Sequence, residues 1–144
     1  MGDAPRTLVP APRQPVDEPG PRVLVADDED DIRALVCLAV AKAGGTVVGS
    51  VGDGASALTV ARAELPDVAI LDVSMPGLDG LDACSALRGD PLTSGVRVLL
   101  LSAGASFDDV ARGLSAGADA YLSKPFSIAG LVHQLRSVTG RQPA

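Results

Sequence analysis

Short apolar runs alternate with segments of helical periodicity along most of this sequence, and this alternation limits the fold more than any other feature. Five apolar runs are predicted to be buried strands: Val23–Ala26, Thr46–Val48, Val68–Leu71, Val96–Leu101 and Ala120–Leu122. Strands that alternate with helices predict an α/β fold, in which helices cover both faces of an open parallel sheet.

The segments between these strands predict five helices. The first begins near Asp30 and Asp31, whose carboxylates are favourable at the positive end of a helix dipole, and ends at Gly44-Gly45. The next three are expected at residues 53–64, 78–87 and 107–114. In the last helix an apolar stripe recurs at helical spacing, formed by Ile128, Leu131, Val132, Leu135 and Val138.

A five-stranded sheet of this kind most commonly has the flavodoxin-like, doubly wound order 2-1-3-4-5. That order places the first and third strands side by side. Ligands of such sheets bind beyond the carboxyl ends of the strands. Since aromatic residues make up only 2% of the chain, the core must consist of Val, Leu, Ile and Ala. The residues at the carboxyl ends of the strands are therefore the place to look for function.

Charge and hydropathy exclude several classes of protein. The net charge of -6 argues against direct binding of nucleic acid or of an anionic membrane surface. No apolar run is long enough to predict a membrane span, and the first residues lack the apolar core of a secretory signal. Cys37 and Cys84 are far apart and lack CxxC spacing, so we interpret them as buried hydrophobic residues in a reducing compartment. A cytoplasmic protein is expected.

The distribution of proline suggests how the chain is divided. Six of the eleven prolines lie in the first 21 residues. We therefore predict a disordered Pro-rich tail over residues 1–21, a folded domain over 22–140 and a short tail over 141–144. The folded domain is expected to stand almost alone, without an output domain after its last helix.

Reactive side chains collect where the predicted strands end. Asp27 and Asp28 follow the first strand, Asp72 the third, Ser102 the fourth and Lys124 the fifth. Three neighbouring carboxylates repel one another, and a hard divalent cation such as Mg²⁺ relieves the repulsion while accepting phosphoryl oxygens. With an ammonium and a hydroxyl beside it, this arrangement predicts a phosphoryl-transfer site.

Four motifs then resemble one known family. They are the acidic pair in Val23–Glu29, the loop Leu71–Gly80, the Ser of Leu101–Ala103 and the Lys-Pro pair of Lys124–Phe126. In this order they resemble the receiver domains of two-component response regulators, such as the single-domain chemotaxis regulators. The resemblance extends over about residues 22–139.

The resemblance implies a phosphoprotein that depends on magnesium. Asp72 would accept a phosphoryl group from a sensor histidine kinase or a phosphotransfer protein. The metal would be held by Asp27, Asp28, Asp72 and the backbone carbonyl of Ser74. Lys124 would contact Asp72 and then the phosphoryl oxygens.

The same resemblance implies a conformational switch. Ser102 would move toward the phosphoryl group, and Tyr121 would change rotamer with it. The Lys124-Pro125 peptide bond is expected to be cis. The face made by the fourth helix, the fifth strand and the fifth helix would then bind a downstream effector protein or a second copy of the domain.

Two other functions remain open beside this phosphorelay signalling switch, which is not itself an enzyme. One is a Mg²⁺-dependent phosphatase with an aspartyl nucleophile. Haloacid-dehalogenase-like enzymes of that kind have a second Asp two residues after the nucleophile, and here that position is Ser74. The other is a scaffold that works without phosphorylation, for which missing acids or a missing lysine would be expected.

Overall fold

The computed structural model describes residues 20–104 and 106–140, in which five strands alternate with five helices. The strands are β1 (Arg22–Ala26), β2 (Thr46–Val51), β3 (Val68–Asp72), β4 (Arg97–Ser102) and β5 (Ala120–Ser123). The helices are α1 (Asp30–Lys42), α2 (Gly54–Glu64), α3 (Gly80–Gly89), α4 (Phe107–Ser115) and α5 (Ile128–Thr139). Most of the predicted Pro-rich tail and all of residues 141–144 lie outside the described residues.

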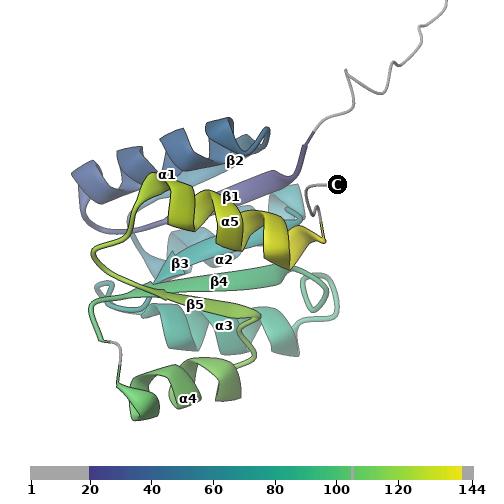
Figure 1. Ribbon diagram of the computed structural model, residues 1–144. Helices are drawn as coiled ribbons and strands as arrows, with labels where there is room; N and C mark the ends of the chain where they lie inside the picture. The colour runs from purple at the N-terminus through teal and green to yellow at the C-terminus, as the bar shows by residue number, and fades with distance from the viewer. Residues whose placement is uncertain (1–19, 105, 141–144) are drawn as a thin grey trace, which may run out of the picture.

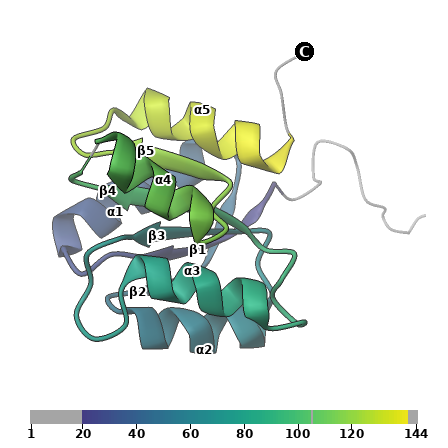
Figure 2. The same ribbon diagram turned by 90° about the horizontal axis from the view of Figure 1, so that it is seen from below.

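All four strand pairs are parallel, and the order is β2-β1-β3-β4-β5. This confirms the predicted flavodoxin-like fold. Helices α1 and α5 pack on one face of the sheet, and α2, α3 and α4 lie on the other side (Figures 1 and 2). Strands β1 and β3 are neighbours, so the residues that follow them meet at one edge of the sheet.

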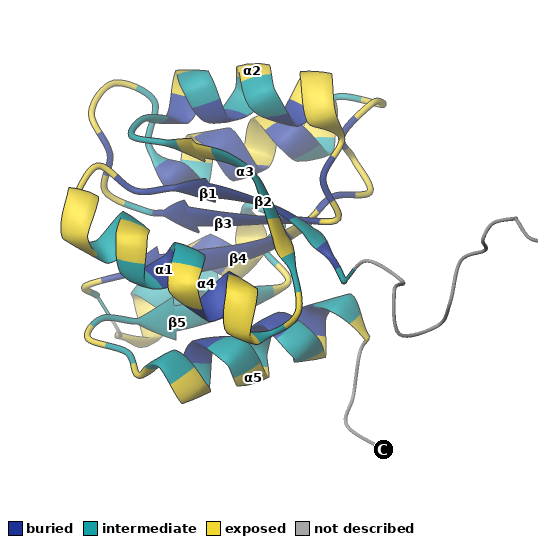
Figure 3. Cartoon of the chain, turned by 90° about the horizontal axis from the view of Figure 1, so that it is seen from above, coloured by how far each residue is buried: buried dark blue, intermediate teal, exposed yellow. Residues whose placement is uncertain are grey.

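The core consists of two aliphatic layers, one on each side of the sheet. Alternate residues of β1 show the division, because Val23 packs with α1 and α5 whereas Leu24 packs with α2 and α3. All five residues of β3 are buried, as expected for a central parallel strand covered on both faces (Figure 3). None of the buried core side chains among the described residues is aromatic, which agrees with the composition.

Several element boundaries differ from the sequence-based prediction, among them the start of α3 and the end of β2. Helix α3 begins at Gly80 rather than at residue 78, because the side chain of Asp79 accepts a hydrogen bond from the backbone N–H of Asp82 and caps the helix. Strand β2 extends to Val51 instead of ending at Val48. It is an edge strand with partly exposed residues, so its apolar pattern is weak.

Two glycines position the loop that follows β3. A Cβ atom at Gly80 would lie 2.2 Å from the backbone oxygen of Asp72, and one at Gly54 would lie 2.1 Å from the backbone oxygen of Leu78. Any larger residue would displace the loop or the helix. The N-termini of α3 and α2 therefore pack directly against residues 72–78 and fix the end of β3.

Candidate functional site

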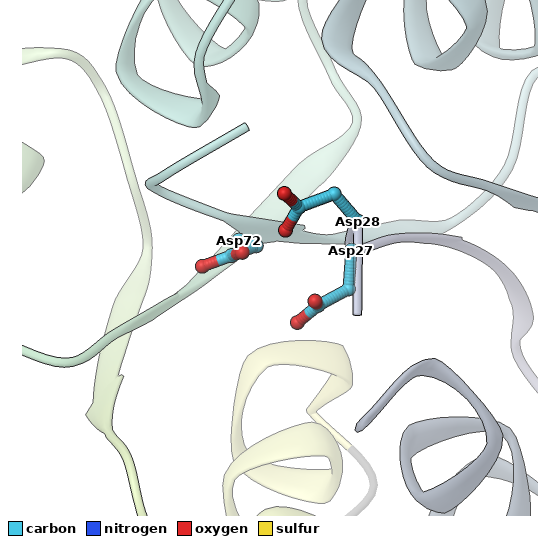
Figure 4. A group of neighbouring side chains, drawn as sticks. All are labelled: Asp27, Asp28 and Asp72. Atoms are coloured by element: carbon cyan, nitrogen blue, oxygen red, sulfur yellow. The ribbon is translucent and has the colours of Figure 1, made fainter. Parts of the chain in front are cut away.

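The carboxyl ends of β1 and β3 bring three aspartates together. Asp27 and Asp28 follow β1, and Asp72 is the last residue of β3. One carboxylate oxygen of each lies within 4.8 Å of those of the other two, and Figure 4 shows the three side chains meeting. Asp27 and Asp72 are buried, whereas Asp28 is exposed. The predicted acidic cluster is thus present in the folded chain.

Lys124 reaches this cluster from the end of β5, the strand at one edge of the sheet. It follows β5, and its backbone N–H donates to the carbonyl of Ser102 at 2.7 Å. Its ammonium lies 3.0 Å from Oδ2 of Asp27 and 3.3 Å from Oδ1 of Asp72. The Lys124-Pro125 peptide bond is cis, as predicted. The sequence-based expectation that Lys124 lies beside Asp72 therefore holds.

The surroundings of Asp72 oppose its ionisation. Burial raises the pKa of Asp72 to about 6, and the negative charge of Asp27 acts in the same direction. The ammonium of Lys124 and the backbone N–H of Ser74, which lies 3.3 Å from Oδ1 of Asp72, act in the opposite direction. Burial alone would lower the pKa of Lys124, but the neighbouring carboxylates outweigh burial and raise it.

A pocket of about 310 Å³ opens above these groups. Its lining consists of Asp28, Glu29, Asp72, Ser74, Ala103 and Lys124. The pocket therefore gives solvent and small ligands access to the carboxylate of Asp72 and to the ammonium of Lys124. The backbone N–H of Ser74 contacts Asp72, whereas the part of its backbone carbonyl in metal binding stays a prediction.

Ser102 and Tyr121 are both connected to the loop between β4 and α4. Ser102 ends β4, is buried, and its Oγ accepts a hydrogen bond from the backbone N–H of Gly104 at 3.0 Å. The hydroxyl of Tyr121 donates to the backbone carbonyl of Gly104 at 2.6 Å. The ring of Tyr121 also lies close to Gly113 of α4. One residue of this loop is thus hydrogen-bonded by both predicted switch residues.

Glu29 is a member of the site that the sequence-based prediction missed. Its Oε1 lies 3.3 Å from the ammonium of Lys124, and its backbone N–H donates to Oδ1 of Asp27 at 2.9 Å. The only sequence signal was its position directly after the acidic pair. Asp30, in contrast, forms an ion pair with Arg33 on the surface of α1, consistent with the structural role predicted for it.

The donor set fits a hard divalent cation. Among the described residues, Oδ2 of Asp27 is a buried polar side-chain atom without a hydrogen-bond partner. Its 3.0 Å ion pair with Lys124 lacks the orientation of a hydrogen bond. An unsatisfied buried carboxylate oxygen beside two further carboxylates is suited to Mg²⁺, which prefers oxygen ligands.

Comparison with known protein families identifies the family to which this sequence belongs. A sequence model of the response regulator receiver domain matches residues 23–136. The chain belongs to the response regulator receiver domain family. Phosphorylation and Mg²⁺ binding at an acidic pocket are typical of this family, and in this chain Asp27, Asp28 and Asp72 form an acidic cluster.

Similar proteins include the transcriptional regulatory protein CseB of Streptomyces coelicolor, 45% identical to this receiver domain over 119 residues. The probable transcriptional regulatory protein TcrX of Mycobacterium tuberculosis is 42% identical over 119 residues. Each alignment covers 83% of this chain, but only 49% of CseB and 50% of TcrX. The chain therefore spans about half the length of these relatives.

Solved receiver domains have the same fold. The receiver domain of the response regulator NarL from Mycobacterium tuberculosis superimposes with a TM-score of 0.80 at 36% identity, covering 86% of this chain and 99% of that one. The chemotaxis protein CheY4 of Vibrio cholerae gives 0.75 at 32% identity and covers 81% and 97%. Within the described residues, no helix is both long and apolar enough to span a membrane.

Proposed function

We propose that this receiver domain is a phosphorelay switch in which Asp72 accepts a phosphoryl group from the phosphohistidine of a sensor histidine kinase or phosphotransfer protein. The observation that carries the proposal is the meeting of Asp72 with Asp27 and Lys124 at one edge of the sheet. The pocket above Asp72 gives a donor access to it. We propose that this exchange takes place in the cytoplasm. The free thiols of Cys37 and Cys84 agree with such a reducing compartment.

The proposed reaction is a displacement at phosphorus. A carboxylate oxygen of Asp72 attacks, the bond between phosphorus and the imidazole nitrogen breaks, and its electron pair stays with the departing imidazole. With a pKa of about 6, Asp72 is mostly ionised at neutral pH and is ready to attack. Lys124 already contacts Asp72 and would pair with the phosphoryl oxygens once the new bond has formed.

The proposed metal ligands are the carboxylates of Asp27, Asp28 and Asp72 and the backbone carbonyl of Ser74. A bound Mg²⁺ supplies positive charge that balances the acidic cluster and the phosphoryl oxygens. The buried, unsatisfied Oδ2 of Asp27 and the close approach of the three carboxylates support this assignment.

Ser102 and Tyr121 are proposed to transmit the change. A phosphoryl group on Asp72 would attract the hydroxyl of Ser102 away from the N–H of Gly104, and the loop that Tyr121 also contacts would then shift. Exposed apolar side chains lie on α4, where Phe107 is 87% exposed and Leu114 is 53% exposed. We propose that the face formed by α4, β5 and α5 binds an effector protein or a second copy of the domain, not nucleic acid.

Two alternatives are less well supported. A phosphatase of the aspartyl type needs a general acid near the nucleophile, and Ser74 occupies the position where such enzymes carry it. A scaffold that works without phosphorylation would not need the buried Asp27 or its ion pair with Lys124. We therefore propose a signalling role without catalytic turnover.

Beryllofluoride, a stable mimic of the phosphoryl group, tests the switch. With Mg²⁺ it is expected to shift the backbone amide resonances of residues 102–104, of α4 and of β5, because Ser102 and Tyr121 connect these segments. Nuclear magnetic resonance of isotope-labelled protein measures the shifts, and Asp72→Asn serves as the control. Shifts confined to the pocket, or the same shifts in Asp72→Asn, would refute the proposed switch.

A further inference from the structure

Glu29 occupies a helix-capping position but does not cap its helix. It is the N-cap residue of α1, and its side chain makes no capping hydrogen bond. In the other four helices of the described chain the N-cap side chain accepts a hydrogen bond from the first turn, through Asp53, Asp79, Ser106 and Ser127. The carboxylate of Glu29 instead accepts from the ammonium of Lys124, 95 positions away in sequence.

Glu29 therefore shares Lys124 with the two buried aspartates. The ammonium has three N–H donors, and three carboxylates lie around it, those of Asp27, Asp72 and Glu29. A phosphoryl group attached to Asp72 would need at least one of these donors. Of these three contacts, only the one with Glu29 has the orientation of a hydrogen bond, so a phosphoryl group on Asp72 would compete with Glu29 for the ammonium.

Glu29 is the carboxylate that can leave at the lowest cost. Its side chain is 63% exposed, whereas that of Asp27 is fully buried and that of Asp72 is 5% exposed. A released Glu29 is hydrated by solvent, but a released Asp27 would be a buried unpaired charge. Glu29 also lines the pocket through which a phosphoryl donor must approach, so its negative charge opposes the arrival of an anion.

We propose that Glu29 is a positioning residue that holds the ammonium of Lys124 in the unmodified domain and must release it when Asp72 is phosphorylated. Glu29 thereby slows loading of Asp72 and favours the unmodified state. This inference rests on the proposed phosphoryl transfer to Asp72, and it adds a restraint on that transfer.

The test compares two variants that remove one negative charge each. Glu29→Gln keeps the size of the side chain but removes the ion pair with Lys124. Asp31→Asn removes an exposed charge two residues later in α1. At physiological ionic strength we expect Glu29→Gln to tighten beryllofluoride binding and to speed modification by acetyl phosphate by about two- to fivefold, the range expected for an exposed ion pair. Asp31→Asn should change either quantity by less than about 1.5-fold, because solvent screens its charge.

A second measurement detects the contact itself in the unmodified protein. The side-chain nitrogen resonance of Lys124 should shift in Glu29→Gln and stay unchanged in Asp31→Asn. A purely structural role of Glu29 at the start of α1 would not produce this difference. Equal effects of the two variants on binding and rate, or an unchanged Lys124 resonance in Glu29→Gln, would overturn the inference. A wild-type protein that takes up neither reagent would instead refute the proposed function, and the Lys124 resonance would still report the contact.

Discussion

Replacing Lys124 by Ala is expected to lower the free energy of unfolding by about 3 kcal/mol at neutral pH in metal-free buffer. The ammonium is the positive charge that lies 3.0 Å from Asp27 and 3.3 Å from Asp72, and Asp27 has no exposed surface. Without Lys124, two buried carboxylates would face each other, and one of them would have to take up a proton. Chemical denaturation of both proteins measures the difference.

The chain offers a matched control for this experiment. Lys42, in the last turn of α1, is exposed, so Lys42→Ala should change stability by less than about 0.5 kcal/mol. Added Mg²⁺ should stabilise Lys124→Ala more than wild type, because the cation replaces the missing positive charge. A loss of stability no larger than that of Lys42→Ala would show that the ion pairs of Lys124 are energetically unimportant.

Asp72→Asn is expected to do the opposite and raise the free energy of unfolding of the metal-free protein by about 2 kcal/mol at neutral pH. The ionised carboxylate of Asp72 makes folding less favourable, because burial and Asp27 raise the pKa of Asp72 to about 6, whereas an unfolded Asp titrates near 4. Asn has nearly the same shape and carries no charge. The residue proposed to carry the function is thus expected to reduce the stability of the apo fold.

The pH dependence of the free energy of unfolding tests the raised pKa on which this prediction depends. Between about pH 4 and pH 6 the folded wild type binds more protons at Asp72 than the unfolded chain does, so its stability falls as pH rises through this window. In Asp72→Asn this contribution should be absent, and urea denaturation at several pH values compares the two slopes. Asp31→Asn, at an exposed position, should retain the wild-type slope. If Asp72→Asn also retains it, the raised pKa of Asp72 is wrong.

The sequence predicted the strands, the helices and the polar residues at the strand ends because these depend on local patterns. Apolar runs followed directly by acids locate β1 and β3, and the parallel order brings their ends together. Lys124 could be placed because its strand, β5, ends at the same edge. The order of the strands itself was taken from the commonest topology of such sheets, since periodicity alone does not determine it.

The features that the sequence did not predict are contacts between residues that come together only in the folded chain. Glu29 looked like one more acid at the start of a helix, and only the position of Lys124, 95 residues later, explains why it does not cap α1. The Gly104 contacts of Ser102 and Tyr121 were equally invisible, because they depend on the path of a loop between two elements. The raised pKa of Asp72 follows from burial and from Asp27, and both are known only once the chain is folded.

Phosphoryl transfer to Asp72 is tested most directly by finding the residue that takes up the phosphoryl group. The protein is incubated with acetyl phosphate and Mg²⁺, the acyl phosphate is reduced with borohydride, and the peptides are sequenced by mass spectrometry. Phosphoryl transfer to Asp72 predicts a single modified residue, Asp72, and no modification when Mg²⁺ is chelated. A label on Asp27, Asp28 or any residue outside the pocket would contradict it.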